Sequence, residues 1–116
     1  MPLIKVQTSV KCTKEKKEKA VKDLSKILTE GTGKPEKYVA SIIEDDAVVA
    51  FAGEIAGSAF VEVKGIGGLT PSVNKALSAS ICKYLKAELG IDPDKVYINY
   101  TDVAATNWGW NSTTFG

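Results

Sequence analysis

The sequence contains no histidine among its 116 residues, and it has only two cysteines. Without histidine, the chain can build neither a Ser-His or Cys-His nucleophile pair nor a zinc site with imidazole ligands. Cys12 and Cys82 lack the short spacing of metal-binding pairs, and a reducing compartment would keep both as thiols. The apolar helical pattern around Cys82 predicts a packing role. Acid–base chemistry therefore has to come from the N-terminus, lysine, tyrosine, cysteine or the carboxylates.

Long apolar runs and an excess of charge are also lacking. No stretch is long enough to span a bilayer, and the first residues, MPLIKVQTSVKC, lack the apolar segment of a signal peptide. We therefore expect a cytoplasmic protein, with unconventional secretion left open. Fifteen basic residues face fourteen acidic ones, so the net charge gives no reason to expect nucleic acid or an anionic membrane as a partner.

The chain repeats itself once, and this repeat predicts its architecture. The segment at 35–42 resembles the segment at 93–100, and each follows a helical pattern that itself follows a short apolar strand. We expect a single domain over residues 1–116, with two pseudo-symmetric β-α-β repeats at about 2–56 and 57–116. The predicted fold class is α+β, a four-stranded mixed sheet with two helices on one face.

Periodicity and capping residues predict the individual elements. One helix is expected from the Thr13 cap to about Glu30, ended by Gly31 and Gly33, and a second from Thr70-Pro71 to Leu89, ended by Gly90. Strands are expected at 3–6, 38–43, 48–51, 59–63 and 96–100, and the tail at 106–116 suits a short strand or an interface segment. The lysine-rich run at 14–19 is interpreted as solvated helix turns, with a basic binding patch as the alternative.

One face of such a sheet would remain uncovered. Several of its positions are apolar, and a sheet with bare edges and a bare apolar face calls for a partner. We therefore expect a homo-oligomer in which residues 48–51 and the tail pair with neighbouring subunits.

Proline at position 2 is the most informative residue in the chain. Removal of Met1 would make Pro2 an N-terminal secondary amine whose ring fixes φ at about −65°. A free α-amine has a pKa of about 7.7–8.0, and burial or a neighbouring cation lowers it. Pro2 is thus a candidate general base near neutral pH. The alternative is a Met-Pro start that only permits methionine removal and stiffens the chain end.

Lys34 and the loop at 65–68 are further candidates. Lys34, next to Gly33, would bind a substrate carboxylate and lower the pKa of Pro2, or else it is an exposed helix cap. The loop GIGG lacks the Walker A and dinucleotide-binding spacings. It is interpreted as backbone that faces a pocket or as a simple strand-to-helix turn.

Polar and aromatic residues near the C-terminus complete the candidates. Strand alternation places Tyr97 and Asn99 on one face of the sheet. Asn99 either hydrogen-bonds a keto acid or bonds to backbone across an interface. Trp108, Trp110 and Phe115 either wall an aromatic pocket or pack at an interface.

Taken in order, these features resemble the macrophage migration inhibitory factor family of the tautomerase superfamily. The resemblance extends nearly from end to end. It rests on the Met-Pro start, TGKP at 32–35, VAFAG at 49–53, IGG at 66–68, DPDKVYINY at 92–100 and NWGWN at 107–111 with the residues to Phe115. It implies a homotrimer with active sites between adjacent subunits.

The resemblance also implies an activity, the cofactor-independent keto–enol tautomerisation of aryl pyruvates such as phenylpyruvate, with dopachrome-like compounds as surrogates. No metal is implied. Pro2 matches the catalytic base, and Lys34 and the backbone at Ile66 match the groups that bind the substrate's carboxylate and oxygens. The remaining matches are two residues that would reach the pocket from the neighbouring subunit and three that form its hydrophobic rim: Tyr97, Asn99, Trp108, Trp110 and Phe115. The alternative is a trimeric signalling or ligand-binding protein with a vestigial pocket.

Three departures from the family pattern bear on this expectation. Ser58 and Val61 stand at the positions of a CxxC segment found in some members, so no thiol–disulfide activity is expected. Gly65 replaces a serine of some relatives, which removes a possible hydrogen bond. Trp108 is bulkier than the small aliphatic residue common there, which predicts a narrower rim and an altered substrate preference.

Overall fold

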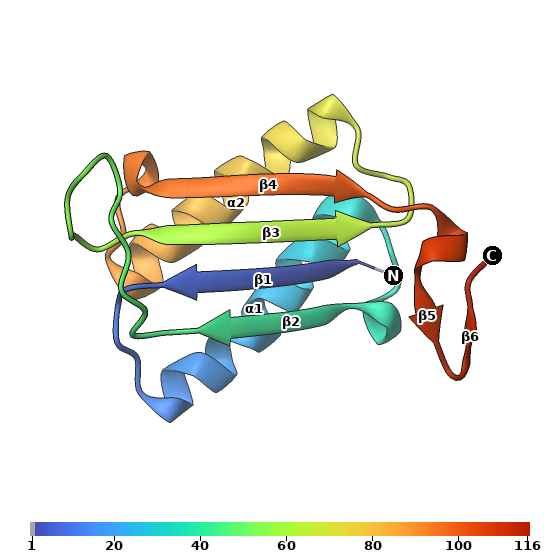
Figure 1. The fold of residues 1–116 in the computed structure, drawn as a ribbon, viewed down its shortest axis with the longest axis horizontal. Helices are drawn as coiled ribbons and strands as arrows, with labels where there is room; N and C mark the ends of the chain where they lie inside the picture. The colour runs from blue at the N-terminus through green and yellow to red at the C-terminus, as the bar shows by residue number, and fades with distance from the viewer. Residues whose placement is uncertain (1) are drawn as a thin grey trace.

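The structure, a computed structural model, describes residues 2–116. Met1, and with it the expected removal of the initiator methionine, lies outside the described residues. The chain forms two long helices, one four-stranded sheet and a small C-terminal hairpin (Figure 1). The elements are β1 (Leu3–Thr8), α1 (Lys14–Thr32), β2 (Ala40–Glu44), β3 (Ala59–Gly65), α2 (Pro71–Leu89), β4 (Val96–Asp102), β5 (Gly109–Trp110) and β6 (Thr113–Thr114), with 3₁₀ turns at Glu36–Tyr38, Pro93–Lys95 and Ala105–Asn107.

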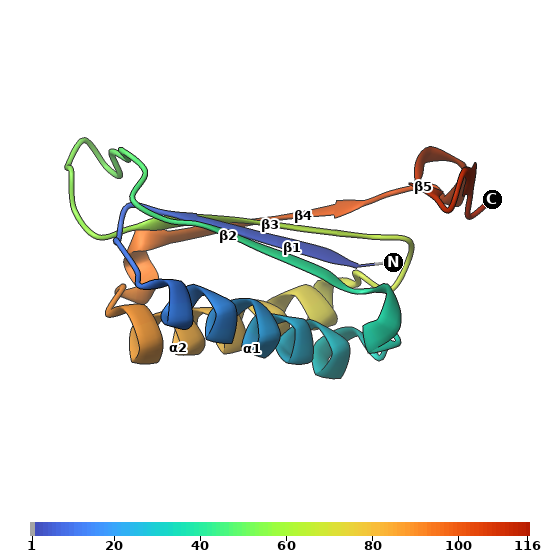
Figure 2. The ribbon, with the colours of Figure 1, turned by 90° about the horizontal axis from the view of Figure 1, so that it is seen from below.

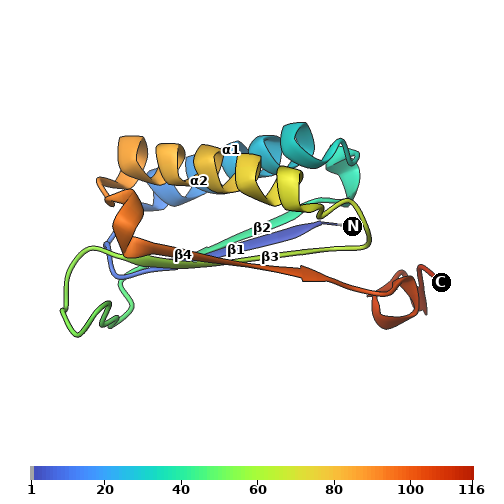
Figure 3. The ribbon, with the colours of Figure 1, turned by 90° about the horizontal axis from the view of Figure 1, so that it is seen from above.

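The four-stranded sheet confirms the predicted α+β fold. Its strand order is β2-β1-β3-β4. The pairs β1–β2 and β3–β4 are parallel, and the central pair β1–β3 is antiparallel, so each half contributes one β-α-β unit. Both helices cover the same face, and the opposite face is open (Figures 2 and 3). None of the described helices is long and apolar enough to cross a membrane.

The core lies between the helices and the inner face of the sheet. Alternation in β1 and β3 turns Ile4, Val6, Val61 and Val63 inward, where all four are fully buried. The helices meet these strands with two apolar stripes at helical spacing. The buried stripe residues are Ala20, Leu24 and Leu28 of α1 and Leu77, Ile81, Leu85 and Leu89 of α2.

Capping residues set the helix boundaries. The Thr13 and Thr70 side chains accept hydrogen bonds from the backbone N–H groups of Lys16 and Val73. Gly33 and Gly90 end the helices with left-handed φ values of 72° and 69°, which glycine adopts without steric cost. The predicted end at Gly31 is wrong, since α1 continues through Gly31 to Thr32.

Two predicted strands also differ from the structure. The strand expected at 38–43 begins only at Ala40, because residues 36–38 after Pro35 form a 3₁₀ turn. The strand expected at 48–51 is absent from the single chain. A strand needs a partner for its backbone groups, and here only a tight turn through Ala52 and Gly53 joins Phe51 to Glu54. Cys82, for which the sequence predicts a packing role, is half-buried and lies outside the core cluster.

The open face of the sheet is mixed in character. Apolar Ile42, Phe60 and Tyr97 lie on it and are 41%, 41% and 67% exposed. Charged residues stand between them, and Lys5 pairs with Glu44 at 3.0 Å. Both sheet edges, β2 and β4, have no neighbour among the described residues. Such edges favour assembly with further chains.

Gly31→Ala should destabilise the protein despite the higher helix propensity of alanine. A Cβ at this position would clash with Cδ2 of the buried Leu77 and lie 3.0 Å from its Cγ. Overpacking costs about 1–3 kcal/mol, which outweighs the helix-propensity gain of up to about 1 kcal/mol. Urea denaturation measures the change. Truncation of the opposing side chain in Gly31→Ala/Leu77→Ala should remove the clash, so losses that simply add would contradict this account.

Asp45→Ala should destabilise the protein at neutral pH but not in acid. The Asp45 carboxylate accepts from the Cys12 N–H at 2.8 Å and pairs with Lys17 at 3.3 Å, linking the end of β2 to the start of α1. The Cys12 hydrogen bond chiefly, and then Lys17, lower the pKa of Asp45. A lowered pKa gives stability that is present above the unfolded pKa of about 3.9 and is lost as pH falls through the folded pKa. Unfolding of both proteins from pH 7 to pH 2 should show their difference shrinking, and a constant difference would contradict this.

Candidate functional site

A hollow of about 370 Å³ lies at the end of the sheet where β1 begins. Pro2 forms part of its wall and is buried. The carbonyl of Pro2 accepts from the Ala40 N–H at 3.1 Å, which extends the β1–β2 pairing by one residue and fixes the backbone there. The size is that of a small-molecule site. Its lining residues are Pro2, Leu3, Lys37, Tyr38, Val39, Ala40, Trp108, Trp110 and Phe115.

Three aromatic rings form one wall of this hollow. Trp110 and Phe115 stack with centroids 5.5 Å apart and an interplanar angle of 9°. Tyr38 meets both edge-on, at 5.7 Å and 6.0 Å. Offset-stacked and edge-to-face contacts are the arrangements that aromatic quadrupoles favour. The wall offers a flat apolar surface to an aromatic ligand.

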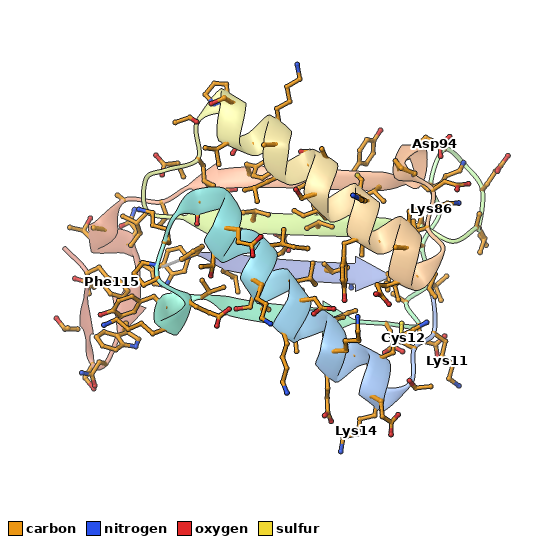
Figure 4. All side chains as sticks on the ribbon, turned by 180° about the vertical axis from the view of Figure 1, so that it is seen from behind. Lys11, Cys12, Lys14, Lys86, Asp94 and Phe115 are labelled. Atoms are coloured by element: carbon orange, nitrogen blue, oxygen red, sulfur yellow. The ribbon has the colours of Figure 1, made fainter. Side chains whose placement is uncertain are left out.

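The C-terminal hairpin positions this wall. Asn111 and Ser112 connect β5 to β6 with φ values of 52° and 66°, the signature of a two-residue type I′ turn. The Phe115 N–H donates to the Trp108 carbonyl at 3.1 Å and closes the hairpin. Figure 4 shows Phe115 at this end of the sheet, near the turn at residues 36–38. Residues from both ends of the sequence therefore meet at one place.

Lys34 and Ile66 form a second polar feature. Lys34 follows the Gly33 cap, its N–H donates to Thr32 Oγ1 at 3.2 Å, and its ammonium donates to the Ile66 carbonyl at 3.2 Å. Its methylene chain runs over the glycine loop, and a Cβ on Gly68 would lie 3.2 Å from Lys34 Cε. Lys34 does not line the hollow of Pro2 in the single chain.

Asp102 holds this glycine loop in place. Its carboxylate accepts from the Gly67 N–H at 2.8 Å, and the Val103 N–H donates to the Gly65 carbonyl at 2.8 Å. Gly67 and Gly68 have φ values of 69° and 81°, which side chains rarely tolerate. The loop is therefore a backbone turn fixed by Asp102, with its Gly67 N–H already hydrogen-bonded.

Tyr97 and Asn99 lie away from the Pro2 of their own chain. Asn99 pairs across β3 with Glu62, which in turn pairs with Lys5 of β1. Three residues along a strand and two strand spacings across the sheet each amount to roughly 10 Å. Tyr97 lies two residues further from Pro2 along β4 and contacts Phe51, with ring centroids 4.6 Å apart and an interplanar angle of 42°. Within a single chain, neither side chain reaches the hollow.

The structure therefore brings together only some of the predicted site residues. Pro2, Trp108, Trp110 and Phe115 meet in one hollow, and Lys34 meets Ile66 beside it. Sequence reasoning missed Lys37 and Tyr38, which lie on the 3₁₀ turn Glu36–Tyr38; the predicted strand at 38–43 includes only Tyr38 of this turn. The proline at position 35, which fixes the turn's N-cap at φ −63°, was the available signal.

The lining of the hollow carries little charge. Lys37 is the one charged side chain on its lining, and its ammonium stands 5.1 Å from the centroid of the Tyr38 ring. Among the described residues, no cluster of three or more cysteine, aspartate or glutamate side chains is arranged to hold a metal ion. A slightly larger groove of about 410 Å³ between α1 and β2 contains none of the predicted site residues.

Comparison with known proteins places this arrangement in a family. The family model described as macrophage migration inhibitory factor (MIF) matches residues 1–116. The chain is 35% identical to macrophage migration inhibitory factor of Xenopus tropicalis over 115 residues, 99% of each chain. It is 36% identical to the Rattus norvegicus protein of that name, again over 99% of each.

Solved structures agree with these matches. A macrophage migration inhibitory factor homologue from Prochlorococcus marinus superimposes with a TM-score of 0.94 at 38% identity, covering 98% of this chain and 99% of that one. The macrophage migration inhibitory factor-like protein of Entamoeba histolytica gives a TM-score of 0.93 at 35% identity, covering 98% of each. With the Pro2 hollow at the head of β1, these matches establish that the chain belongs to the macrophage migration inhibitory factor family of the tautomerase superfamily.

Proposed function

We propose that this protein is a cofactor-independent keto–enol tautomerase that acts on aryl pyruvates of the phenylpyruvate type, with Pro2 as the general base. The observation that carries the proposal is the burial of Pro2 in a hollow that is also lined by stacked and edge-on aromatic rings. The hollow matches both parts of such a substrate, because the aromatic wall accepts its ring and Pro2 stands beside the space for its side chain.

The base in this proposal is the neutral nitrogen of Pro2 after removal of Met1. Burial against apolar walls disfavours the charged form of an amine and lowers its pKa, which suits a base that works near neutral pH. The nitrogen takes the proton from the enol oxygen of the substrate. The same proton then passes from the proline ammonium to the adjacent carbon, so the ketone forms and Pro2 returns to its starting state.

Lys34 and the backbone at Ile66 bind the polar end of the substrate in this account. Lys34 is tethered by the Ile66 carbonyl and lies over the fixed loop at 65–68. A tethered ammonium loses less entropy on binding a carboxylate than a free lysine side chain does. It also contributes positive charge near the developing enolate, a form of electrostatic stabilisation.

The complete site, we propose, forms between subunits of a homotrimer. Tyr97 and Asn99 are exposed on the open face and lie far from their own Pro2. The open sheet edges and the exposed Val48 and Ile55 of the loop after β2 supply surfaces for assembly. A neighbouring subunit would bring Tyr97 and Asn99 to the hollow and pair with residues 48–51, which form no strand alone.

Pro2→Gly should lower the rate of phenylpyruvate ketonisation by about 10²-fold or more, the usual contribution of a positioned general base. Stopped-flow or absorbance assays of the enol measure this, and the oligomeric state should not change. Intact mass must first show that Met1 is absent, since an acylated Pro2 nitrogen has no basicity. Pro71→Ala, in the first turn of α2, is the matched control.

Unchanged activity in Pro2→Gly would sink the catalytic proposal. A trimer that binds aryl acids in its hollow without turning them over would instead support the alternative, a ligand-binding or signalling protein with a vestigial pocket.

Mixed trimers test whether each site combines two subunits. Pro2→Gly and Asn99→Ala should each be weakly active alone. Unfolding both together and refolding them at equal concentration should restore about one quarter of the wild-type activity, because random assembly of a symmetric oligomer gives that share of sites both intact residues. Mixing without unfolding is the control. No recovery after co-refolding would show that Pro2 and Asn99 act within one subunit.

A further inference from the structure

Lys37 occupies a distinct place in the hollow. It belongs to the 3₁₀ turn Glu36–Tyr38 and is the only charged residue on the hollow's lining. Its ammonium lies 5.1 Å from the Tyr38 ring centroid, and that ring meets both Trp110 and Phe115. A positive charge therefore stands at the aromatic wall itself, where the ring end of a ligand would rest.

This charge is not committed to another group. Lys37 makes no ion pair and its ammonium donates no hydrogen bond to any residue between Pro2 and Gly116. By contrast, Lys5, Lys17, Lys19 and Lys95 each pair with a carboxylate. The contact with the Tyr38 ring orients the side chain without neutralising it. An exposed ammonium beside a partly apolar wall is a favourable position for an anion.

Two cations thus serve different parts of the site. Lys34 is held at the glycine loop by the Ile66 carbonyl, whereas Lys37 is held at the aromatic wall by Tyr38. A ring that rests on the aromatic wall lies in the hollow whose lining Lys37 shares with Trp110 and Phe115. An unsubstituted phenyl ring offers this ammonium nothing to pair with.

We infer that Lys37 binds a second anionic group on the ring end of the ligand, so that the protein favours aryl pyruvates with an acidic ring substituent over plain phenylpyruvate. This inference rests on the proposed function for its reactive end. The recognition itself depends only on the hollow with its Lys37, and on Lys34 at the neighbouring glycine loop.

The first test compares phenylpyruvate with 4-carboxyphenylpyruvate in wild type, Lys37→Gln and Lys37→Arg. Glutamine keeps much of the side-chain length but removes the charge. The ratio of kcat/KM for the dianionic to the monoanionic substrate should fall about three- to fivefold in Lys37→Gln, the upper part of the range for an exposed ion pair. The change should lie mainly in KM, and Lys37→Arg should restore the ratio. Lys83→Gln, on the exposed side of α2, is the matched control.

A second measurement keeps recognition separate from catalysis. The saturated acids 3-phenylpropanoate and 3-(4-carboxyphenyl)propanoate cannot tautomerise, and the fluorescence of Trp108 and Trp110 reports their binding. Wild type should bind the dianion about three- to fivefold more tightly at low salt, and this preference should weaken as ionic strength rises. Pro2→Gly should keep the preference. Loss of catalysis with the preference intact would then overturn the proposed function and leave this inference standing.

The inference fails if the ratio in Lys37→Gln stays within twofold of the wild-type ratio. That result includes the case in which Lys37 binds the pyruvate carboxylate itself, because both substrates would then weaken together. It fails equally if neither saturated acid binds, or if wild type has no preference for the dianion.

Discussion

The antiparallel pairing of β1 with β3 is the constraint on which the rest of this structure depends. It joins the two β-α-β halves, aligns Leu3 with Lys64 and so places the start of β1 beside the end of β3. Pro2 precedes Leu3, and the glycine loop follows Gly65. The catalytic candidate and the loop that anchors Lys34 are therefore brought to the same end of the sheet by a register that also buries Ile4, Val6, Val61 and Val63. A slip of one residue would turn this core outward.

The ends of the chain complete what this pairing begins. The C-terminal hairpin crosses to the side of Pro2, and its Trp110 and Phe115 meet Tyr38 from the turn before β2. Two segments that are distant in sequence, the turn at residues 36–38 and the C-terminal hairpin, thus form a single wall. The edge-to-face contacts of Tyr38 with Trp110 and Phe115 link the two segments.

The open face of the sheet has a composition that suits both contact with water and contact with another chain. The residues that face away from the helices mix charges with rings, as Lys5, Glu62 and Phe60 do. Such a surface stays compatible with water and yet offers apolar contacts to a partner. Residues 48–51, in turn, form no strand in the single chain. Their backbone groups have no ladder to join within the described chain.

Much of the fold could be predicted from local signals. Thr13, Thr70, Gly33 and Gly90 marked the helix ends because capping is a local interaction. Apolar periodicity located both core stripes, and the internal repeat predicted the two β-α-β units. The main error occurred where a local signal conflicted with a contact between distant segments. Gly31 was interpreted as a helix end, but its missing side chain makes room for Leu77 of α2, a contact that no local pattern reveals.

The sequence by itself determined which groups are available: a proline that can become a free amine, lysines near glycine turns, and aromatic residues at the C-terminus, with no histidine to replace them. Only the tertiary structure decided which of these groups meet. It put Lys37 and Tyr38 in the same hollow as Pro2 and held the Lys34 ammonium at the neighbouring glycine loop. It also separated Tyr97 and Asn99 from the Pro2 of their own chain. Residue types and caps act over a few positions of the chain, whereas these distances are set by sheet register and by side-chain packing between segments far apart in sequence.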